Sequence, residues 1–309
     1  MQNCLGFYYF HYICKLDFEK INNMAKVISM INLKGGVGKT STIIALAEFL
    51  TYQQNKSVLV VDLDPQTNAT VALIGEEEWK KRNNKGKTLL QLFKDKLDKT
   101  EKFSLTDSIV KNVSNINGGI NKLDLLPSSL ELIDIQDKLP LISAGRFFAT
   151  SPVTILRDAI SDIIEEYEYV LIDCPPNLGI ITLNGILISN YFLIPSIPDI
   201  LSTYGIPQIL NRISDFANET NINIQPLGII ISMYRTNSRL HNTTIKVLNS
   251  KFASKEYPRI FNTIVPLSTK TAEASDHEAT VNTIKQKYGY GGYFDVYDSL
   301  TKELLSYVD

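Results

Sequence analysis

The chain has 309 residues, which is enough for one large α/β domain or for two small ones. Its content of 44% hydrophobic and 21% charged residues excludes a disordered or collagen-like chain. The net charge of -2 argues against a surface that is basic throughout, as in proteins that coat nucleic acid. The cysteines are too few and too scattered for a disulfide framework or a four-ligand zinc site, so we expect a reducing cytoplasm; they are Cys4, Cys14 and Cys174.

Residues 1–23 differ in character from the sequence that follows. They are rich in aromatic residues and lack the basic start and the small-residue cleavage site of a secretory signal. Met24 then opens the sequence MAKVISMINLKGG, which has the form of a natural start. We therefore expect residues 1–23 to be a poorly ordered extension or the product of an upstream start, with an aromatic membrane hook as the alternative. No apolar run reaches the roughly 18 residues of a membrane span, so no transmembrane helix is predicted.

Apolar runs and helical spacing alternate from residue 24 onward. Buried strands are predicted at 27–33, 58–61, 123–126, 170–172, 191–195 and 227–231. Helical spacing separates them, as at 40–50, 155–166 and 204–217. Continuous apolar strands that alternate with helices are typical of a doubly wound, mostly parallel sheet with helices on both faces. We therefore predict the α/β class and a single domain over residues 24–309.

The stretch 76–102 has a different composition from the rest of this domain. It contains the runs EEEWKKRNNKGK and KDKLDKTEK, in which charges of both signs are dense. Mixed charge runs of this kind usually face solvent. We predict a solvated insertion here, with one short helix near residues 89–93.

A glycine-rich turn at residues 34–41, KGGVGKTS, follows the first predicted strand and opens the first predicted helix. This is the context of a phosphate-binding loop, in which backbone N–H groups and the positive end of the helix dipole face the phosphates. Lys39 adds a point charge, and the Thr40 hydroxyl can bind Mg²⁺. The predicted nucleotide-binding residues of the loop are Gly35, Gly36, Val37, Gly38, Lys39, Thr40 and Ser41.

The loop departs from the common pattern G-x-x-x-x-G-K-[ST], because Leu33 stands at the first glycine position and a second lysine, Lys34, follows it. In this it resembles the deviant Walker-A class of P-loop ATPases, the ParA/MinD family, whose loop reads K-G-G-x-G-K-[ST]. The resemblance implies ATP and Mg²⁺ as cofactors and a homodimer that ATP closes. It also implies that Lys34 reaches the nucleotide of the other subunit and stabilises charge at the γ-phosphate, as an arginine finger does. A lysine that merely faces solvent is the alternative.

Acidic residues end two of the predicted strands, and carboxylates at such ends project towards the ligand-binding edge of an open α/β sheet. The segment VVDLDPQ at 60–66 resembles the family's DxDPQ motif, which implies that Asp64 orients the attacking water and that Asp62 supports the Mg²⁺ shell. The segment VLIDCPP at 170–176 resembles the family's Walker B motif, which implies that Asp173 holds a metal-bound water. Cys174 is interpreted as a small buried residue, because no histidine is in place to activate it. The expected catalytic residues are Lys34, Lys39 and Asp64, and the expected metal-site residues are Thr40, Asp62 and Asp173.

The resemblance covers residues 25–305 and is closer to the partition ATPases than to the cell-division inhibitors. It implies that Met233 and Tyr234, at the end of the sixth predicted strand, lie in the segment whose backbone faces the adenine. Pro266 is implied to line the same part of the nucleotide site.

The distribution of charge along the chain modifies the conclusion about nucleic acid that was drawn from the net charge of -2. Residues 230–287 carry nine Lys or Arg against four acidic residues, whereas residues 288–309 carry one lysine against four acidic residues. Several members of the family bind DNA without sequence preference through basic residues in this part of the chain, which implies weak, salt-sensitive contacts to phosphates. The candidate DNA-binding residues are Arg235, Arg239, Lys246 and Lys270, and a solvated helical face is the alternative explanation.

The resemblance to partition ATPases implies a cytoplasmic protein that is associated with the nucleoid when ATP is bound. A ParB-like or other cargo adaptor would stimulate hydrolysis, and the cargo would be a plasmid or a chromosome, with a protein compartment such as a carboxysome as the alternative. A MinD-like membrane regulator would need a basic amphipathic helix at the C-terminus. The chain ends in TKELLSYVD with a single lysine, so no membrane partner is expected.

Two further classes share the deviant loop. Bacterial tyrosine kinases carry tyrosine clusters near the C-terminus, and this chain has Tyr288, Tyr290, Tyr293, Tyr297 and Tyr307. The intervening Gly289, Gly291 and Gly292 favour a packed turn instead. Iron-protein reductases hold a cluster through two cysteines per subunit, and the lack of cysteine between residues 15 and 173 excludes them.

Overall fold

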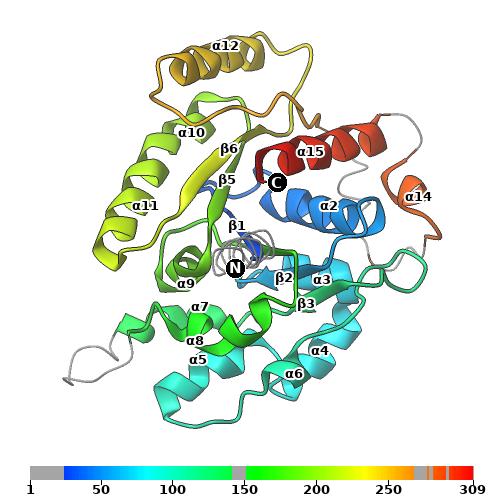
Figure 1. Ribbon diagram of the computed structural model, residues 1–309, viewed down its shortest axis with the longest axis vertical. Helices are drawn as coiled ribbons and strands as arrows, with labels where there is room; N and C mark the ends of the chain where they lie inside the picture. The colour runs from blue at the N-terminus through cyan, green and yellow to red at the C-terminus, as the bar shows by residue number, and fades with distance from the viewer. Residues whose placement is uncertain (1–23, 141–150, 268–276, 278–280, 290–291, 309) are drawn as a thin grey trace, which may run out of the picture.

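The computed structural model describes residues 24–140, 151–267, 277, 281–289 and 292–308. Parallel strands form one six-stranded sheet in the order β3-β2-β4-β1-β5-β6 (Figure 1), which confirms the predicted α/β class. The expectations for residues 1–23, Lys270 and Tyr290 lie outside the described residues. The strands are β1 (Lys26–Met30), β2 (Val58–Asp62), β3 (Leu123–Leu126), β4 (Tyr169–Asp173), β5 (Tyr191–Ser196) and β6 (Gln225–Ile231).

The strands form where apolar, often β-branched residues run without interruption. Every residue of β2 and β4 is buried, as expected for strands that helices cover on both faces. The apolar run at 27–33 is a strand only as far as Met30, after which the chain enters the glycine-rich loop. In register, Asp173 of β4 lies beside Asp62 of β2 and Met30 of β1. The carboxyl ends of three neighbouring strands therefore meet at one edge of the sheet, where ligands of such folds bind.

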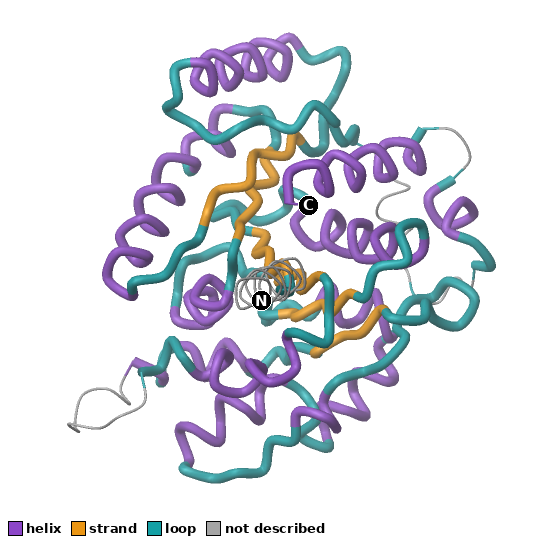
Figure 2. The backbone as a smooth tube through the Cα atoms, viewed as in Figure 1, coloured by secondary structure: helices purple, strands orange, loops and turns teal. Residues whose placement is uncertain are grey.

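Helices cover the two faces of the sheet (Figure 2). Two separate apolar clusters are buried between these helices and the sheet. One face is covered by α2 (Lys39–Tyr52), α3 (Asn68–Ile74), α14 (Ile284–Tyr288) and α15 (Tyr293–Val308). The other face is covered by α5 (Leu89–Asp98), α7 (Leu132–Gln136), α8 (Ile155–Ile164), α9 (Ile180–Ile188) and α11 (Ile206–Thr220). The remaining described helices are α4 (Glu76–Asn84), α6 (Leu105–Ser108), α10 (Ile200–Tyr204) and α12 (Arg239–Ala253). Trp79 of α4 and Leu248 of α12 belong to the two buried clusters. Within the described ranges, no helix is long and apolar enough to cross a membrane.

The helix that follows the glycine-rich loop is fixed to the C-terminal part of the chain. Glu48 of α2 is fully buried, and its carboxylate accepts hydrogen bonds from Lys287 Nζ at 2.6 Å and from the Tyr288 hydroxyl at 2.8 Å. The Ser114 hydroxyl donates to the same carboxylate at 2.6 Å. A buried ion pair is costly to break, because the loss of one partner leaves the other charge uncompensated. These contacts therefore hold α2, and with it the loop at its amino end, in one position.

The structure differs from the prediction for residues 76–102. The stretch forms two helices, α4 and α5, rather than a solvated insertion with one short helix. Trp79 is buried and its indole N–H donates to the backbone oxygen of Ser128 at 3.2 Å, while Leu89 and Phe93 have no exposed surface. The many charged residues mask this apolar side, because most of them occupy the outward positions of both helices, with Asp95 as a buried exception. The predicted helix at 204–217 also differs, since α10 ends at Tyr204 and α11 begins at Ile206.

Candidate nucleotide-binding site

The glycine-rich loop joins β1 to α2 at the carboxyl edge of the sheet. Gly36 and Gly38 have φ angles of 71° and 81°, in the left-handed region that favours glycine. A Cβ atom added to Gly35 or Gly36 would meet no described atom within 4 Å, so bare backbone faces open space there. Because α2 begins at Lys39, the unsatisfied N–H groups and the positive dipole end of this helix lie at the same place. The loop is therefore shaped to bind an anion such as a phosphate.

A cavity of about 400 Å³ lies over the loop, a volume typical of small-molecule sites. Val37 is the one predicted loop residue that does not line it; its side chain is fully buried, and its carbonyl accepts a hydrogen bond from the Ser232 hydroxyl at 2.7 Å. The cavity is lined by the loop, by the residues after β2 and β4, by α3 and by the end of β6: Gly35, Gly36, Gly38, Lys39, Thr40, Ser41, Asp64, Gln66, Asn68, Val71, Ala72, Pro176 and Met233.

Lys39 places a nearly buried ammonium group beneath the loop. Its Nζ donates to the backbone oxygens of Asn32 and Lys34, both at 3.4 Å, so the side chain spans the loop that contains it. Burial lowers the pKa of Lys39, and the carboxylates of Asp173 and Asp64 oppose this effect. The long hydrogen bonds leave this cation able to exchange backbone oxygens for phosphate oxygens.

Asp64 and Asp173 bring two carboxylates to the same edge. Asp64 lines the cavity, whereas Asp173 is fully buried and has no hydrogen-bond partner for either carboxylate oxygen among the described residues. Burial raises the pKa of Asp173 to about 7; the nearby Thr40 hydroxyl and Lys39 lower it in part, and Asp64 raises it further. An unpartnered buried carboxylate beside a threonine hydroxyl offers the oxygen ligands that Mg²⁺ prefers. The residues present therefore fit this ion.

Asp62 lies behind Asp64 and has partners within the chain. One carboxylate oxygen accepts the N–H of Asp64 at 3.1 Å, and the other accepts the N–H and the hydroxyl of Thr70 at 2.9 Å and 2.6 Å. Burial and the neighbouring Asp173 raise the pKa of Asp62 well above its usual range. Asp62 and Asp173 are both absent from the cavity lining, and the support of the metal shell by Asp62 stays a prediction. Asp62 fixes the backbone that presents Asp64 and the first turn of α3.

Lys34 lies at the rim, on the side of α10. Its Nζ is 3.1 Å from Oδ2 of Asp199, and its backbone N–H donates to Asn32 Oδ1 at 2.8 Å. The side chain is not part of the cavity lining within this subunit. The lysine is thus directed towards a neighbouring element and not simply into solvent.

Two residues that the sequence analysis did not single out hold the site together. The Asn32 side chain donates to the backbone oxygen of Pro195 at 2.7 Å, which ties the start of the loop to β5. The Ser128 hydroxyl donates to the backbone oxygen of Asp64 at 2.8 Å, and its N–H donates to the Thr70 hydroxyl at 2.9 Å. The serine follows a predicted strand and the asparagine precedes the loop, but neither position reveals such distant partners.

The predicted adenine contacts separate into two groups. Met233 and Pro266 meet in a small cavity of about 30 Å³ that adjoins the main one. Tyr234 points elsewhere, because its hydroxyl donates to Asn242 Oδ1 of α12 at 2.6 Å. Its backbone N–H and C=O are both engaged by residues 265–267, at 3.0 Å and 2.9 Å. The predicted adenine contact of the Tyr234 backbone stays a prediction, and only its carbonyl oxygen, which has a second lone pair, could still accept a hydrogen bond from a base.

The described candidates for DNA binding gather on or near α12. Arg235, Arg239 and Lys246 are all exposed, and none of them lines the nucleotide cavity. Figure 1 shows α12 at one end of the molecule, beyond β6 and away from α4 and α6. The helix has the sequence RLHNTTIKVLNSKFA, which contains no acidic residue.

Known proteins share both the sequence pattern and the fold. The AAA domain family matches residues 25–226. The chain is 30% identical over 260 residues to the chromosome-partitioning ATPase Soj of Treponema pallidum, a match that covers 84% of this chain and 90% of Soj. Among solved structures, apo McdA of Cyanothece has a TM-score of 0.68 at 22% identity, covering 91% of this chain and 99% of McdA. Cobyrinic acid a,c-diamide synthase of Mycobacterium smegmatis, with ADP and magnesium bound, has a TM-score of 0.64 at 25% identity, covering 84% and 99%.

A parallel sheet with a glycine-rich loop before a helix, and with acidic residues on the neighbouring strand ends, defines a P-loop nucleotide-binding protein. The sequence matches assign the chain to a narrower family within this class of proteins. The chain belongs to the Soj/ParA family of partition ATPases, as the motifs indicate. The cofactors of this family of ATPases are ATP and Mg²⁺. The glycine-rich loop and the carboxylates beside it fit both of these cofactors.

Proposed function

We propose that this chain is an ATP-dependent partition or positioning ATPase whose ATP-bound homodimer binds DNA without sequence preference. The observation that supports this most is the place of Lys34. Lys39, Thr40 and Asp64 converge on one cavity within the subunit, whereas Lys34 lies at its rim and is directed towards α10. A lysine at the rim of the cavity is suited to contact a nucleotide that is bound by a second copy of the chain.

Each residue of the site then has a distinct task. Bound ATP with Mg²⁺ supplies the γ-phosphate and the cation that neutralises it. The loop N–H groups and Lys39 bind the phosphates, while Thr40 and Asp173 hold the metal shell. Asp64 orients the attacking water, and Lys34 of the second copy stabilises the charge that develops on the transferred group.

DNA binding is assigned to the exposed basic residues of α12. Contacts of a few Lys and Arg side chains with phosphates give weak binding that falls steeply with salt. A ParB-like or other adaptor would connect the dimer to a plasmid, a chromosome or a protein compartment and stimulate hydrolysis. In this proposal the protein is cytoplasmic and lies on the nucleoid in its ATP-bound state.

Two alternatives gain no support from the described residues. Tyr288 and Tyr297 are buried, and the Tyr288 hydroxyl donates to Glu48, so neither side chain is presented as a kinase substrate. The C-terminal helix α15 buries Leu300 and Leu304 against α2, so its apolar side faces the core and not a membrane.

ATP hydrolysis by the full chain tests the role of Lys34. Lys39→Ala should weaken nucleotide binding and abolish turnover, because its cation faces the phosphates. Lys34→Ala should retain binding of a fluorescent ATP analogue and lower turnover by about 100-fold, the usual effect of losing one charge-stabilising group. Lys80→Ala, an exposed change on α4, is the matched control. Wild-type turnover in Lys34→Ala would contradict the proposed role.

Fluorescence anisotropy with a random-sequence DNA duplex tests the second half of the proposal. In a salt series with a non-hydrolysable ATP analogue, the double change Arg239→Ala and Lys246→Ala should weaken binding and reduce the salt slope by about 2. The double change Lys80→Ala and Lys81→Ala on α4 removes the same charge elsewhere and should have little effect. Equal DNA affinity in ADP and in the ATP analogue would contradict an ATP-controlled DNA switch.

A further inference from the structure

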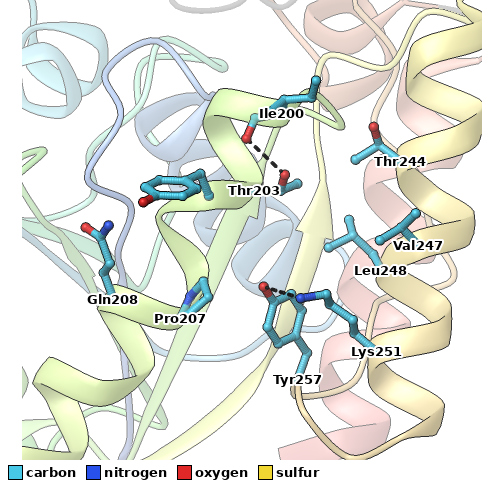
Figure 3. A pocket seen from close by; sticks show the side chains of 10 residues that line it. Ile200, Thr203, Pro207, Gln208, Thr244, Val247, Leu248, Lys251 and Tyr257 are labelled. Carbon is cyan, nitrogen blue, oxygen red and sulfur yellow. Dashed lines mark hydrogen bonds between the residues drawn. The ribbon is translucent and has the colours of Figure 1, made fainter.

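The segment that follows α12 runs along the outer edge of β6 and is fastened at several points. Figure 3 shows its first contact, where Lys251 Nζ of α12 donates to the Tyr257 hydroxyl at 3.4 Å, in an apolar groove of about 440 Å³. Residues 259–261 then pair with β6 through two backbone hydrogen bonds with Ile229, at 2.8 Å and 2.9 Å. Residues 262–267 continue the path, and they are held by the C-terminal helix α15.

The carboxylate of Glu303, on α15, holds the first part of this stretch. Its Oε1 accepts the N–H of Asn262 at 2.7 Å, and its Oε2 accepts the N–H and the hydroxyl of Thr263 at 2.9 Å and 2.7 Å. The Asn262 side-chain amide and the Tyr307 hydroxyl also donate to Oε1, at 3.1 Å and 2.9 Å. Hydrogen bonds to an ionised acceptor are stronger than those between neutral groups. A single side chain therefore fixes Asn262 and Thr263 to α15.

Both oxygens of the Glu303 carboxylate are needed for this contact. Burial raises the pKa of Glu303, but the hydrogen bonds that it accepts outweigh this effect and hold the pKa below its ordinary value of 4.5. The backbone N–H groups of Asn262 and Thr263 can only donate. A glutamine has one oxygen, so its N–H₂ group would face one of these two donors. A change of Glu303 to glutamine therefore breaks the contact while it keeps the size of the side chain.

The stretch that Glu303 holds leads directly into one wall of the nucleotide site. Residues 265–267 line the small cavity of about 30 Å³ together with Gly38, Ser41 and Met233. The same three residues also line the nucleotide cavity, so the two spaces adjoin. A single residue separates Thr263 from this wall. A shift of Thr263 would therefore move the wall.

The helix α15 also holds the far end of this wall. The Tyr293 hydroxyl donates to the backbone oxygen of Leu267 at 3.2 Å, and Tyr297, which is buried, lines the small cavity. From Tyr293 to Glu303 the helix rises about 15 Å. Residues 263–267 span about 14 Å when they are extended. The two lengths match, so the wall is joined to α15 at both of its ends.

We propose that Glu303 is a positioning residue that holds residues 262–267 to α15 and thereby sets the affinity of the nucleotide site for the base of ATP. This inference rests on the proposed function and deepens it, because it separates the support of the phosphate site from that of the base site. The glycine-rich loop is held through α2, by the pair of Glu48 and Lys287. The wall that contains Pro266 is held through α15. Loss of Glu303 therefore releases the base wall and leaves the phosphate site in place.

Isothermal titration calorimetry of the full chain with a non-hydrolysable ATP analogue and with inorganic tripolyphosphate tests the proposal. Glu303→Gln should raise the dissociation constant of the ATP analogue by about tenfold, because one backbone donor is left unsatisfied and the wall shifts. The dissociation constant of tripolyphosphate, which has no base, should be unchanged. In steady-state ATP hydrolysis, KM should rise by a similar factor with kcat unchanged.

The matched control is Asp298→Asn. It removes a carboxylate from the same helix, one that pairs with Lys302 at 2.7 Å. Neither dissociation constant should change in this variant.

A second variant acts at the other end of the wall. Tyr293→Phe removes the hydrogen bond to the Leu267 oxygen and keeps the ring. It should raise the dissociation constant of the ATP analogue by about two- to threefold, again with no change for tripolyphosphate. This variant tests the wall even if Glu303→Gln does not fold.

Wild-type affinity for the ATP analogue in folded Glu303→Gln would overturn the inference and leave the proposed function standing. Equal losses of affinity for the analogue and for tripolyphosphate would also overturn it, because Glu303 would then only stabilise the fold. If Glu303→Gln does not fold, unchanged affinity in Tyr293→Phe overturns the inference. A wild-type chain that does not bind the ATP analogue would overturn both proposals.

Discussion

The helices α4 and α5 and the helix α10 reverse the usual relation between charge and burial. The stretch 76–102 is the most densely charged part of the chain, yet it buries Trp79 and Phe93 in the core. The helix α10 has no charged residue, yet Leu201 is 77% exposed. Net composition therefore says little about which segment is packed. The spacing of apolar residues decides burial in the first region, and the second has an apolar face without a partner in its own subunit.

The largest effect is expected where the charged region enters the core. Trp79→Ala should lower the free energy of unfolding by about 3–5 kcal/mol, because it leaves a cavity and removes the indole hydrogen bond to Ser128. Urea denaturation followed by circular dichroism measures this change. Glu77→Ala, an exposed change two residues earlier on α4, should alter it by less than about 0.5 kcal/mol. Equal stability of both variants would show that α4 is only a solvated insertion.

A smaller effect on the free energy of unfolding, which depends on pH, is expected towards the other end of residues 76–102. The Asp95 carboxylate of α5 accepts hydrogen bonds from the Thr100 hydroxyl and from the backbone N–H groups of Lys102 and Phe103. Burial raises the pKa of Asp95, but these hydrogen bonds outweigh it and hold the pKa below the ordinary value of 3.8. Asp95→Asn should therefore cost about 1–3 kcal/mol at pH 7.

The sign of the pH dependence follows from the lowered pKa. The folded chain binds this proton more weakly than the unfolded chain, so the stabilisation is complete above the unfolded pKa and is lost as the pH falls through the folded pKa. The difference in free energy of unfolding between the wild type and Asp95→Asn should shrink as the pH falls from 5 to 2.5. Urea denaturation at each pH measures this difference. Asp98→Asn, at an exposed position of the same helix, is the control. A difference that does not vary with pH would contradict this account.

The smallest effect on stability is expected at α10. Leu201→Ser should change the free energy of unfolding of the nucleotide-free monomer by no more than about 0.5 kcal/mol, because the side chain makes little contact within its own subunit. The same denaturation experiment measures it. A loss comparable to that of Trp79→Ala would show that α10 is held by the monomer and would remove the contrast between the two regions.

Most of the fold could be predicted from local sequence. The runs at 58–61 and 123–126 are strands almost to the residue, because buried parallel strands need uninterrupted apolar residues. The glycine-rich loop was equally predictable, since Gly36 and Gly38 adopt positive φ angles that few other residues tolerate. The helices at 76–102 could not be predicted from charge density, because a helix can be charged on one side and buried on the other.

The candidate site could be predicted only in part. The residues of the loop, Asp64 and Met233 are brought to one cavity because each follows a strand that ends at the same edge. The engagement of Asp62 by Thr70 and the direction of Tyr234 towards Asn242 depend on hydrogen bonds between helices and loops. Neither leaves a periodic signal in the sequence. The pairing of Lys34 with Asp199 joins residues far apart in the chain and needs the sheet order to be known.

The place of β1 in the sheet has a consequence for how the protein is made. β1 lies at the centre, but its two neighbours, β4 and β5, begin only at Tyr169 and Tyr191. A strand whose partners lie so far along the chain must close a long loop before any pairing is gained, which slows folding. On the ribosome the segment that bears the glycine-rich loop must therefore wait, unpaired, for the second half of the sheet to emerge. A nascent chain that stops before β5 leaves one edge of β1 without a partner and the loop without its anchor at Pro195.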